Sequence, residues 1–124
     1  LGIHPGMGSS WTLPRLVGPA HAADLLFSGR SIDGVEAERI GLVNRAVERD
    51  AVLPAALALA GEIAACAPIA VRGSKRALAR AQDVALDEQL DFEAEQQAIC
   101  YESADLAEGL RATREKRPPR FEGS

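Results

Sequence analysis

The sequence predicts an α/β protein that is mostly helical over these 124 residues. Apolar residues recur at helical spacing through most of the chain after Asp50. Glycine and proline divide the part before Asp50 at regular intervals, and residues 42–47 alternate well enough to form one strand. Because a lone strand leaves its backbone donors and acceptors unpaired, its partner is expected from chain outside these residues or from another subunit.

The chain opens on a glycine-rich turn that leads into a helix. Gly6 and Gly8 lack a Cβ, so backbone N–H groups in this turn can approach a ligand closely. Ser9 and Ser10 are expected to cap the helix, whose first N–H groups have no partner inside it. The turn is therefore suited to a water, a carbonyl oxygen or an anion.

Further helix ends are predicted before residue 50. One helix ends and another begins at Gly18-Pro19, and glycines close helices at Gly29 and Gly41. Asp33 and Glu36 have the spacing of a capping box, which predicts a short helix that Gly41 ends.

After Asp50 the pattern predicts four helices, over residues 52–65, 69–81, 84–101 and 104–117. One face of the third carries Leu86, Leu90, Ala94, Ala98 and Tyr101. Residues 51–71 are the one stretch that hydropathy could assign to a membrane, but a glutamate and two prolines interrupt it. We interpret this stretch as a buried helix and predict no membrane partner.

Few large side chains are available for a core. Aromatic residues make up 4% of the chain, so each of the large residues is expected to matter for packing: Trp11, Phe27, Phe92, Tyr101 and Phe121. Cys66 and Cys100 fit neither a disulfide framework nor a zinc site. We therefore expect a reducing compartment and a cytoplasmic location, with mitochondria as the alternative if a transit peptide precedes these residues.

The opening residues carry a family resemblance. Residues 1–18 read L-G-I-H-P-G-M-G-S-S-W-T-L-P-R-L-V-G. This resembles the segment L-G-x-x-P-G-x-G-G-x-x-x-L-P-R-L-V-G of the crotonase family (enoyl-CoA hydratase/isomerase), with Ser9 in place of a second glycine. Four further blocks follow in family order, at residues 26–33, 36–44, 108–109 and 115–121. The resemblance spans essentially all 124 residues, but only the C-terminal half of a typical member.

The resemblance implies an α/β crotonase-like (ClpP/crotonase) fold whose main sheet lies in the N-terminal half of a member. Residues 1–50 would then form the end of the crotonase core. Residues 51–124 would form a C-terminal helical region for oligomerisation and contact with coenzyme A. A homotrimer or hexamer is also implied by the family.

For the chemistry, the resemblance implies that two backbone N–H groups hold the thioester oxygen while two glutamates activate and deliver water. All four are expected upstream of Leu1, so these residues alone are expected to be inactive. Gly6 matches the family glycine whose backbone N–H helps to hold the catalytic water. The alternative is that Gly6 only makes the turn. Related dehalogenases carry an aspartate nucleophile here, so a glycine argues against that branch.

The C-terminal run is the second candidate site. Five cations stand against Glu115 alone in ten residues: Arg111, Arg114, Lys116, Arg117 and Arg120. In the crotonase family a lysine at the Lys116 position meets the phosphates of coenzyme A, a contact that a cleft would strengthen. The alternative is a solvated, frayed terminus.

Two further positions are assigned to substrate binding. Many family members carry phenylalanine where Thr113 stands, and threonine would make that wall of the acyl pocket smaller and more polar. This leaves short, branched or functionalised thioesters open. Trp11, just after the glycine turn, is the other. The resemblance implies an acyl-CoA thioester as the substrate, and no further cofactor is expected.

Other chemistries are disfavoured by the residues. His4 is interpreted as structural or pocket-lining and His21 as solvated, and their separation matches no metal site, so no metal is predicted. A dinucleotide fingerprint fails because Trp11 stands where its third glycine belongs. A pI near 5.2 and the lack of interleaved aromatics predict no nucleic-acid partner.

The function expected is therefore that of the C-terminal part of an enoyl-CoA hydratase-like enzyme, which adds water to 2-enoyl-CoA thioesters. An enoyl-CoA isomerase of the same family is one alternative. A non-catalytic helical oligomerisation module from a truncated relative is the other.

Overall fold

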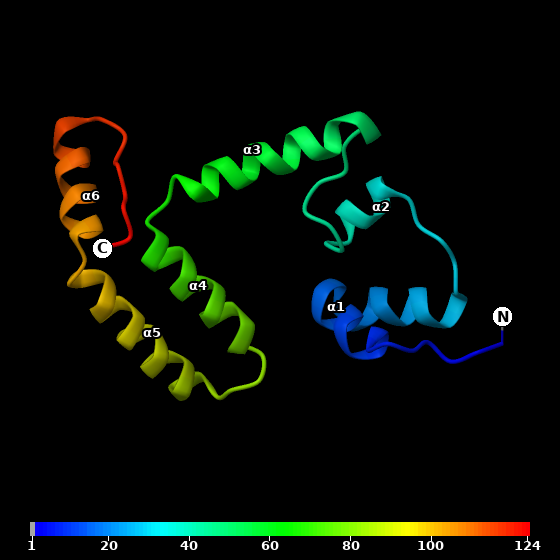
Figure 1. Ribbon diagram of the computed structural model, residues 1–124. Coiled ribbons are helices and arrows are strands. Elements are labelled where there is room, and N and C mark those ends of the chain that lie inside the picture. Colours follow the sequence, from blue (N-terminus) through cyan, green and yellow to red (C-terminus); the bar gives the residue numbers. More distant parts are fainter. Residues whose placement is uncertain (1) are drawn as a thin grey trace. The chain divides into compact units, whose positions relative to one another are not determined.

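The computed structural model describes residues 2–124 (Figure 1). Its helices are α1 (Ser9–Ser28), α2 (Gly34–Arg39), α3 (Val52–Ala64), α4 (Pro68–Arg80), α5 (Leu86–Tyr101) and α6 (Ala104–Glu115), with a 3-10 turn, η1, at Arg49–Ala51. The chain forms two compact units, one up to Val52 and one from Leu53 onward. The helix bounds after Asp50 agree with the sequence prediction to within two residues.

Helix α1 is two helical segments joined at a bend. Gly18 has φ 79° and ψ 161°, an extended conformation with positive φ that glycine adopts readily. Pro19 follows and begins the second segment, where its fixed φ suits a first turn and its missing N–H is not needed. Gly29 closes the helix in the left-handed conformation, donating its N–H to the Leu25 carbonyl at 3.0 Å. Both predicted breaks are confirmed.

The short helix α2 begins as the sequence predicted, but only half of the capping box forms. The Asp33 carboxylate accepts a hydrogen bond from the Glu36 N–H at 2.8 Å. The Glu36 carboxylate instead pairs with Arg30, which also holds Asp24 at 2.7 Å. Arg30 thus ties the end of α1 to the start of α2, and Glu36 holds the pKa of Arg30 above its ordinary value.

The first unit has a small apolar core between α1 and α2. Its buried members are Val17, Ala22 and Ile40, and partly buried Leu13, Leu25, Ile32 and Leu42 pack against them. These residues come from both segments of α1 and from the chain on either side of α2. The bend at Gly18 therefore lies inside the part of α1 that carries this core.

The predicted strand at residues 42–47 is wrong, because these residues form bends and irregular chain. The Leu42 and Val43 N–H groups both donate to the Ala37 carbonyl, at 2.8 and 3.3 Å. The Ala46 N–H donates to the Glu38 carboxylate at 3.0 Å. Alternating apolar residues need a neighbouring strand, and here α2 takes up the donors instead.

In the second unit, α4 and α5 form an antiparallel pair and α5 leads into α6 (Figure 1). Gly73 lets the two helices approach closely, since a Cβ there would lie 3.4 Å from the Gln96 side-chain oxygen. The Gln89 amide donates to the Ala77 carbonyl on α4 at 3.3 Å. The Arg80 guanidinium lies 4.5 Å from the centre of the Phe92 ring.

The apolar face predicted for α5 does not form the packed face. Its members Leu86, Leu90, Ala94, Ala98 and Tyr101 are all exposed. The packed face carries Gln89, Phe92, Gln96 and Cys100, which are buried or half-buried. Spacing alone does not decide which face packs. The hydrogen bonds from glutamine amides and arginines to the partner helix make the polar face the buried one.

Helix α3 was expected to be buried, and this prediction is also wrong. None of its residues is buried, and Leu53 and Leu57 are more than 60% exposed. No described helix packs against it extensively. Within residues 2–124 no single helix has the length and hydropathy to cross a bilayer; the bent pair Arg49–Ala64 and Pro68–Arg80 satisfies length and composition only.

The aromatic residues contribute less to the core than the sequence suggested. Trp11, Phe27 and Tyr101 are between 53% and 88% exposed, so the expectation that each matters for packing is wrong for these three. Phe92 and Phe121 are half-buried. Small side chains such as Ala112, at 1% exposure, fill the close contacts, because only they fit where backbones approach.

We expect Asp33→Ala to lower the free energy of unfolding by about 1 kcal/mol, because the Glu36 N–H would lose its acceptor at the start of α2. Urea unfolding followed by circular dichroism measures this change. Asp83→Ala is the matched control, since no side-chain hydrogen bond of Asp83 occurs within residues 2–124. Equal losses in the two variants would contradict the capping role.

Candidate functional site

The glycine turn before α1 is built from Gly6, Met7 and Gly8. Met7 and Gly8 are both left-handed, with φ 57° and 79°. The Gly6 carbonyl accepts two hydrogen bonds from Ser9, one from its N–H at 3.1 Å and one from its hydroxyl at 2.9 Å. Gly8 is the N-cap residue of α1. The turn is therefore closed by bonds back to the Gly6 carbonyl.

The prediction that Ser9 and Ser10 cap α1 is wrong. Ser9 is already the first helical residue, and no side chain caps the helix at Gly8. The Ser9 hydroxyl donates back to Gly6 instead of accepting from the helix. The first helical N–H groups are thus not covered by a serine oxygen, because the left-handed Gly8 occupies the cap position.

The backbone conformation of Gly6, unlike that of Gly8, does not require a glycine. Its φ is not in the left-handed region, and a Cβ at Gly6 would meet no atom within 4 Å. Its N–H donates to no acceptor in the part of the chain that the structure describes. Neither turn geometry nor internal crowding therefore demands a glycine at this position, whereas Gly8 with φ 79° does favour one.

Trp11 lies in the first turn of α1, near this glycine turn, and is 53% exposed. The Arg15 guanidinium stacks 3.8 Å from the centre of its ring and also donates to the Trp11 carbonyl at 2.9 Å. Trp11 therefore presents a ring with one face covered by a cation. His4 and His21 are both exposed. No cluster of metal-ligating side chains occurs within residues 2–124.

The second candidate site lies at the end of α6, where Lys116 is left-handed with φ 53°. The Lys116 N–H donates to the Thr113 carbonyl, and the Arg117 N–H donates to the Ala112 carbonyl at 3.1 Å. This is a Schellman-type ending, in which glycine is the usual residue. A lysine there costs about 1 kcal/mol or more of backbone strain. Lys116 is exposed and forms no ion pair within the described residues.

Thr113 precedes this turn on the same helix end and is exposed. Its hydroxyl donates to the Gly109 carbonyl at 2.8 Å, so the polar hydrogen is used within α6. The structure therefore brings Thr113 and Lys116 together at one end of α6. Gly6 and Trp11 lie in the first unit, and Thr113 and Lys116 in the second.

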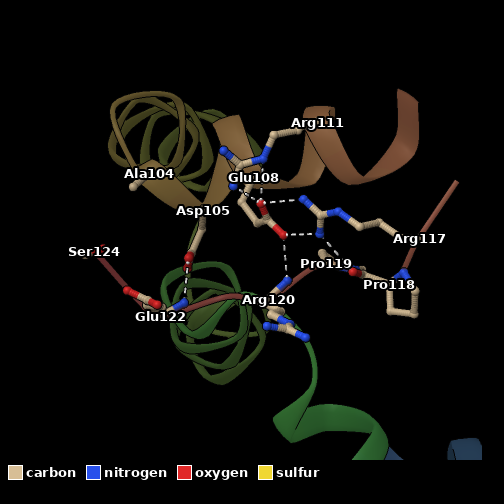
Figure 2. Close-up of a pocket in the computed structure, with 10 residues that line it drawn as sticks. All are labelled: Ala104, Asp105, Glu108, Arg111, Arg117, Pro118, Pro119, Arg120, Glu122 and Ser124. Carbon is tan, nitrogen blue, oxygen red and sulfur yellow. Dashed lines mark hydrogen bonds and ion pairs between the residues drawn. The ribbon is translucent and has the colours of Figure 1, made fainter. Parts of the chain in front are cut away.

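A buried carboxylate, Glu108, holds the chain after Lys116 against α6 (Figure 2). It is 8% exposed and accepts from the Arg117 guanidinium at 2.6 and 3.1 Å and from the Arg120 N–H at 2.9 Å. Arg111 forms a further ion pair with it. These donors, Arg117 above all, hold the pKa of Glu108 well below its usual range.

A second buried carboxylate, Asp105, fixes the very end of the chain. It is 4% exposed and accepts from the Glu122 and Gly123 N–H groups at 2.8 and 3.0 Å. The Ser124 carbonyl in turn accepts from the Ala104 N–H at 2.7 Å. Residues 117–124 are therefore held along α6, which contradicts the alternative of a frayed terminus.

The basic run is also less cationic than the sequence implied. Arg111 and Arg117 both pair with Glu108, and Arg117 also pairs with Glu115, while the Arg120 side chain points away from Glu108 (Figure 2). An open cavity of about 800 Å³ between the tail and α6 is lined by three acidic and three basic side chains: Asp105, Glu108, Glu122, Arg111, Arg117 and Arg120. Their charges balance, so the cavity itself is no strong anion site.

Sequence reasoning missed the roles of Asp105 and Glu108. Glu108 and Arg111 are three residues apart on one helix, a spacing that predicts their ion pair. No local pattern predicts that Arg117, nine residues on, or the Glu122 N–H, seventeen residues beyond Asp105, returns to the same helix.

With this geometry in place, comparison with known proteins is decisive. The family model for enoyl-CoA hydratase/isomerase matches residues 1–124. The chain belongs to the enoyl-CoA hydratase/isomerase family. A crotonyl-CoA hydratase of Syntrophomonas wolfei is 40% identical over 121 residues, which are 98% of this chain and 46% of the relative. A short-chain-enoyl-CoA hydratase of Clostridium acetobutylicum is also 40% identical, over 117 residues, covering 94% of this chain and 45% of the relative.

Solved structures of this family agree. An enoyl-CoA hydratase from Bacillus anthracis superposes with a TM-score of 0.91 at 36% identity, covering 99% of this chain and 48% of that one. A probable enoyl-CoA hydratase/isomerase from Mycobacterium abscessus superposes with a TM-score of 0.88 at 40% identity, covering 99% and 49%. The predicted crotonase-like fold class is confirmed. The chain spans about half the length of the relatives that it matches.

We expect Glu108→Gln to lower the urea midpoint of unfolding at pH 7, because Arg117 and Arg111 would lose their anionic partner. The folded state lowers the pKa of Glu108, so its stabilisation is present above the ordinary carboxyl pKa of about 4.3 and is lost as the pH falls below it. The difference between wild type and variant should therefore narrow below about pH 4. Glu95→Gln, at an exposed position on α5, is the control, and its urea midpoint should match that of the wild type at every pH.

Proposed function

We propose that this chain is part of an enzyme that adds water to the double bond of 2-enoyl-CoA thioesters, and that it supplies a water-positioning turn and a contact for coenzyme A. The observation that carries the proposal is Gly6, whose N–H has no acceptor in residues 2–124 and whose Cβ position is open. Family membership supplies the reaction class to which this turn would contribute.

The backbone of Gly6 supports close approach by a water more than a simple turn role. A glycine kept for turn geometry would show a positive φ or a crowded Cβ, and Gly6 shows neither. An N–H donor without a side chain beside it can hold a water at hydrogen-bond distance while leaving room for the substrate. The adjacent left-handed Met7 and Gly8 fix the direction of this part of the backbone.

Lys116 is proposed to bind the phosphates of coenzyme A. Its ammonium group is exposed and free of ion pairs within the described residues, whereas Arg117 and Arg111 are engaged. A free cation on a strained, well-held turn is suited to a phosphate, since a charge-assisted contact strengthens where water is partly excluded.

Thr113 and Trp11 are proposed as further substrate contacts. Thr113 is exposed on α6 one turn before Lys116, and Trp11 exposes an aromatic ring near the glycine turn. The polar side chain of Thr113 favours a short or functionalised acyl group over a long aliphatic one. The names of two relatives, a crotonyl-CoA hydratase and a short-chain-enoyl-CoA hydratase, support this choice.

The proposal assigns proton transfer to glutamates outside these residues. The two buried carboxylates that the structure describes in the second unit, Asp105 and Glu108, are occupied by the C-terminal tail. Their oxygens accept from backbone N–H groups and arginines, which leaves them poorly suited to deliver a proton to a substrate.

Assembly as a homotrimer or hexamer and a cytoplasmic location belong to the same proposal. Exposed apolar side chains on α3 and α5 support assembly, because burying them against another subunit would be favourable. Cys66 and Cys100 are both free thiols, which supports a reducing compartment.

A non-catalytic helical module is the second candidate, because α3 exposes its apolar side chains as an assembly element would. An apolar helix without a packed neighbour is a feature of an assembly element whether or not catalysis is retained. A hydratase assay of the intact protein with crotonyl-CoA separates the two, since a helical module gives no turnover.

We expect Gly6→Ala in the intact enzyme to lower kcat at least about tenfold, because a methyl group would displace the water. Stability should change by less than about 0.5 kcal/mol, since the Cβ position is open. Hydration of crotonyl-CoA, followed by loss of the enoyl absorbance, and thermal unfolding measure both effects. Gly8→Ala is the control: its φ of 79° predicts lower stability instead. An unchanged kcat in Gly6→Ala would assign Gly6 to the turn alone.

We expect Lys116→Glu to raise the KM for crotonyl-CoA about tenfold and to leave the KM for a crotonyl-pantetheine thioester unchanged, since only the former carries the nucleotide phosphates. Arg114→Glu makes the same charge change at an exposed position two residues away on α6 and should raise the KM for crotonyl-CoA less. Equal losses for both substrates would count against a phosphate contact.

A further inference from the structure

The turn that carries Lys116 is held from both sides. The carboxylate of Glu115, the residue before it, pairs with Nε of Arg117, the residue after it, at 2.6 Å. Lys116 therefore lies inside a bridge formed by its own neighbours. Its own side chain forms no ion pair in the described part of the chain. The bridge fixes the backbone and leaves the ammonium group unengaged.

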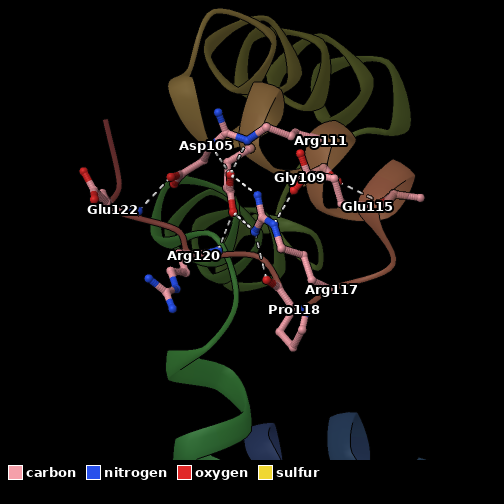
Figure 3. A network of polar contacts seen from close by, with 10 residues as sticks. Asp105, Gly109, Arg111, Glu115, Arg117, Pro118, Arg120 and Glu122 are labelled. Atoms are coloured by element: carbon pink, nitrogen blue, oxygen red, sulfur yellow. Dashed lines mark hydrogen bonds and ion pairs between the residues drawn. The ribbon is translucent and has the colours of Figure 1, made fainter.

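Arg117 is in turn fixed to the body of α6. Its two terminal nitrogens meet the two oxygens of Glu108 at 2.6 and 3.1 Å, a fork that fixes both direction and distance. One of these nitrogens also donates to the Pro118 carbonyl at 3.1 Å (Figure 3). We call Glu108, Arg117 and Glu115 the Glu108 clamp.

The chain beyond the turn meets the same carboxylate. The Arg120 N–H donates to Glu108 at 2.9 Å, so the segment that leaves Lys116 returns to the helix that enters it. Glu108 is 8% exposed and accepts from three residues on both sides of the turn. A single buried group thus sets the path of the backbone through Lys116.

A purely structural turn has no need of lysine. Glycine adopts the left-handed conformation without strain and ends helices of this kind most often. The chain keeps a strained lysine here and surrounds it with a clamp that would also hold a glycine. Strain that the surroundings maintain points to a use for the side chain that bears it.

We propose that Glu108 and Arg117 are positioning residues, which hold the left-handed turn so that the Lys116 ammonium is presented in one direction to the phosphates of coenzyme A. The inference rests on the proposed function of Lys116 and adds the residues through which it acts. The proposal gives neither Glu108 nor Arg117 a contact with the ligand, because their side chains bond to each other. Substitutions at Glu108 or Arg117 should therefore change the affinity for coenzyme A thioesters only in a protein that retains Lys116.

A double-mutant cycle in the intact protein tests this dependence. The variants are Glu108→Gln, Lys116→Met and their combination, with butyryl-CoA and butyryl-pantetheine as unreactive ligands in calorimetry. The measured quantity is the ratio of the two dissociation constants. Circular dichroism and thermal unfolding report the folded state. Arg117→Lys serves as a second variant that keeps the charge but cannot span both oxygens of Glu108, so a poorly folding Glu108→Gln would not end the test.

We expect Lys116→Met to weaken the binding of butyryl-CoA about tenfold relative to the binding of butyryl-pantetheine. Glu108→Gln alone should change the ratio of the two dissociation constants about threefold or more in the same direction. In the Lys116→Met background, Glu108→Gln should not change this ratio further. A change of equal size in the Lys116→Met background would overturn the positioning role, because a structural defect does not depend on the lysine.

Two further outcomes separate this inference from the proposed function. If Lys116→Met changes the ratio and Glu108→Gln does not, the phosphate contact stands and the positioning role is overturned. If Lys116→Met leaves the ratio unchanged, the phosphate contact fails and the positioning role fails with it.

Discussion

The buried carboxylate of Glu108 is the interaction on which the C-terminal end of this chain depends. A buried carboxylate is unfavourable unless its oxygens are paired, and here two arginines and a backbone N–H satisfy them. Asp105, one turn earlier on α6, does the same for the last residues. Together the two carboxylates hold the charged residues 117–124 in one ordered path along α6.

Strain in the described backbone is concentrated at the two candidate sites. Met7 and Lys116 are the two non-glycine residues with positive φ within residues 2–124. Met7 follows Gly6 in the opening turn, and Lys116 ends α6. The turns are held by different means: bonds from Ser9 back to the Gly6 carbonyl in one, and an ionic clamp in the other. Such conformations persist only where their surroundings hold them, which is why they are informative about function.

Much apolar surface remains uncovered within the described residues. The buried core of the first unit is small, and α3 buries none of its side chains. Covering the leucines on α3 and α5 with further protein surface would lower the free energy of the folded protein. The chain spans about half the length of its relatives, and helices of this composition are suited to contacts beyond the chain itself.

The sequence by itself determined the features that depend on near neighbours. Helix bounds, the bend at Gly18, the glycine end at Gly29 and the cap at Asp33 all follow from residues within four positions of one another, and family membership follows from motif order. Only the tertiary structure decided which face of α5 packs against α4, that α3 buries no side chain within residues 2–124, that residues 42–47 form no strand there, and that Arg117 returns to Glu108. These outcomes depend on which surfaces meet after the chain folds back, and periodicity along the chain carries no information about the partner that a face will find.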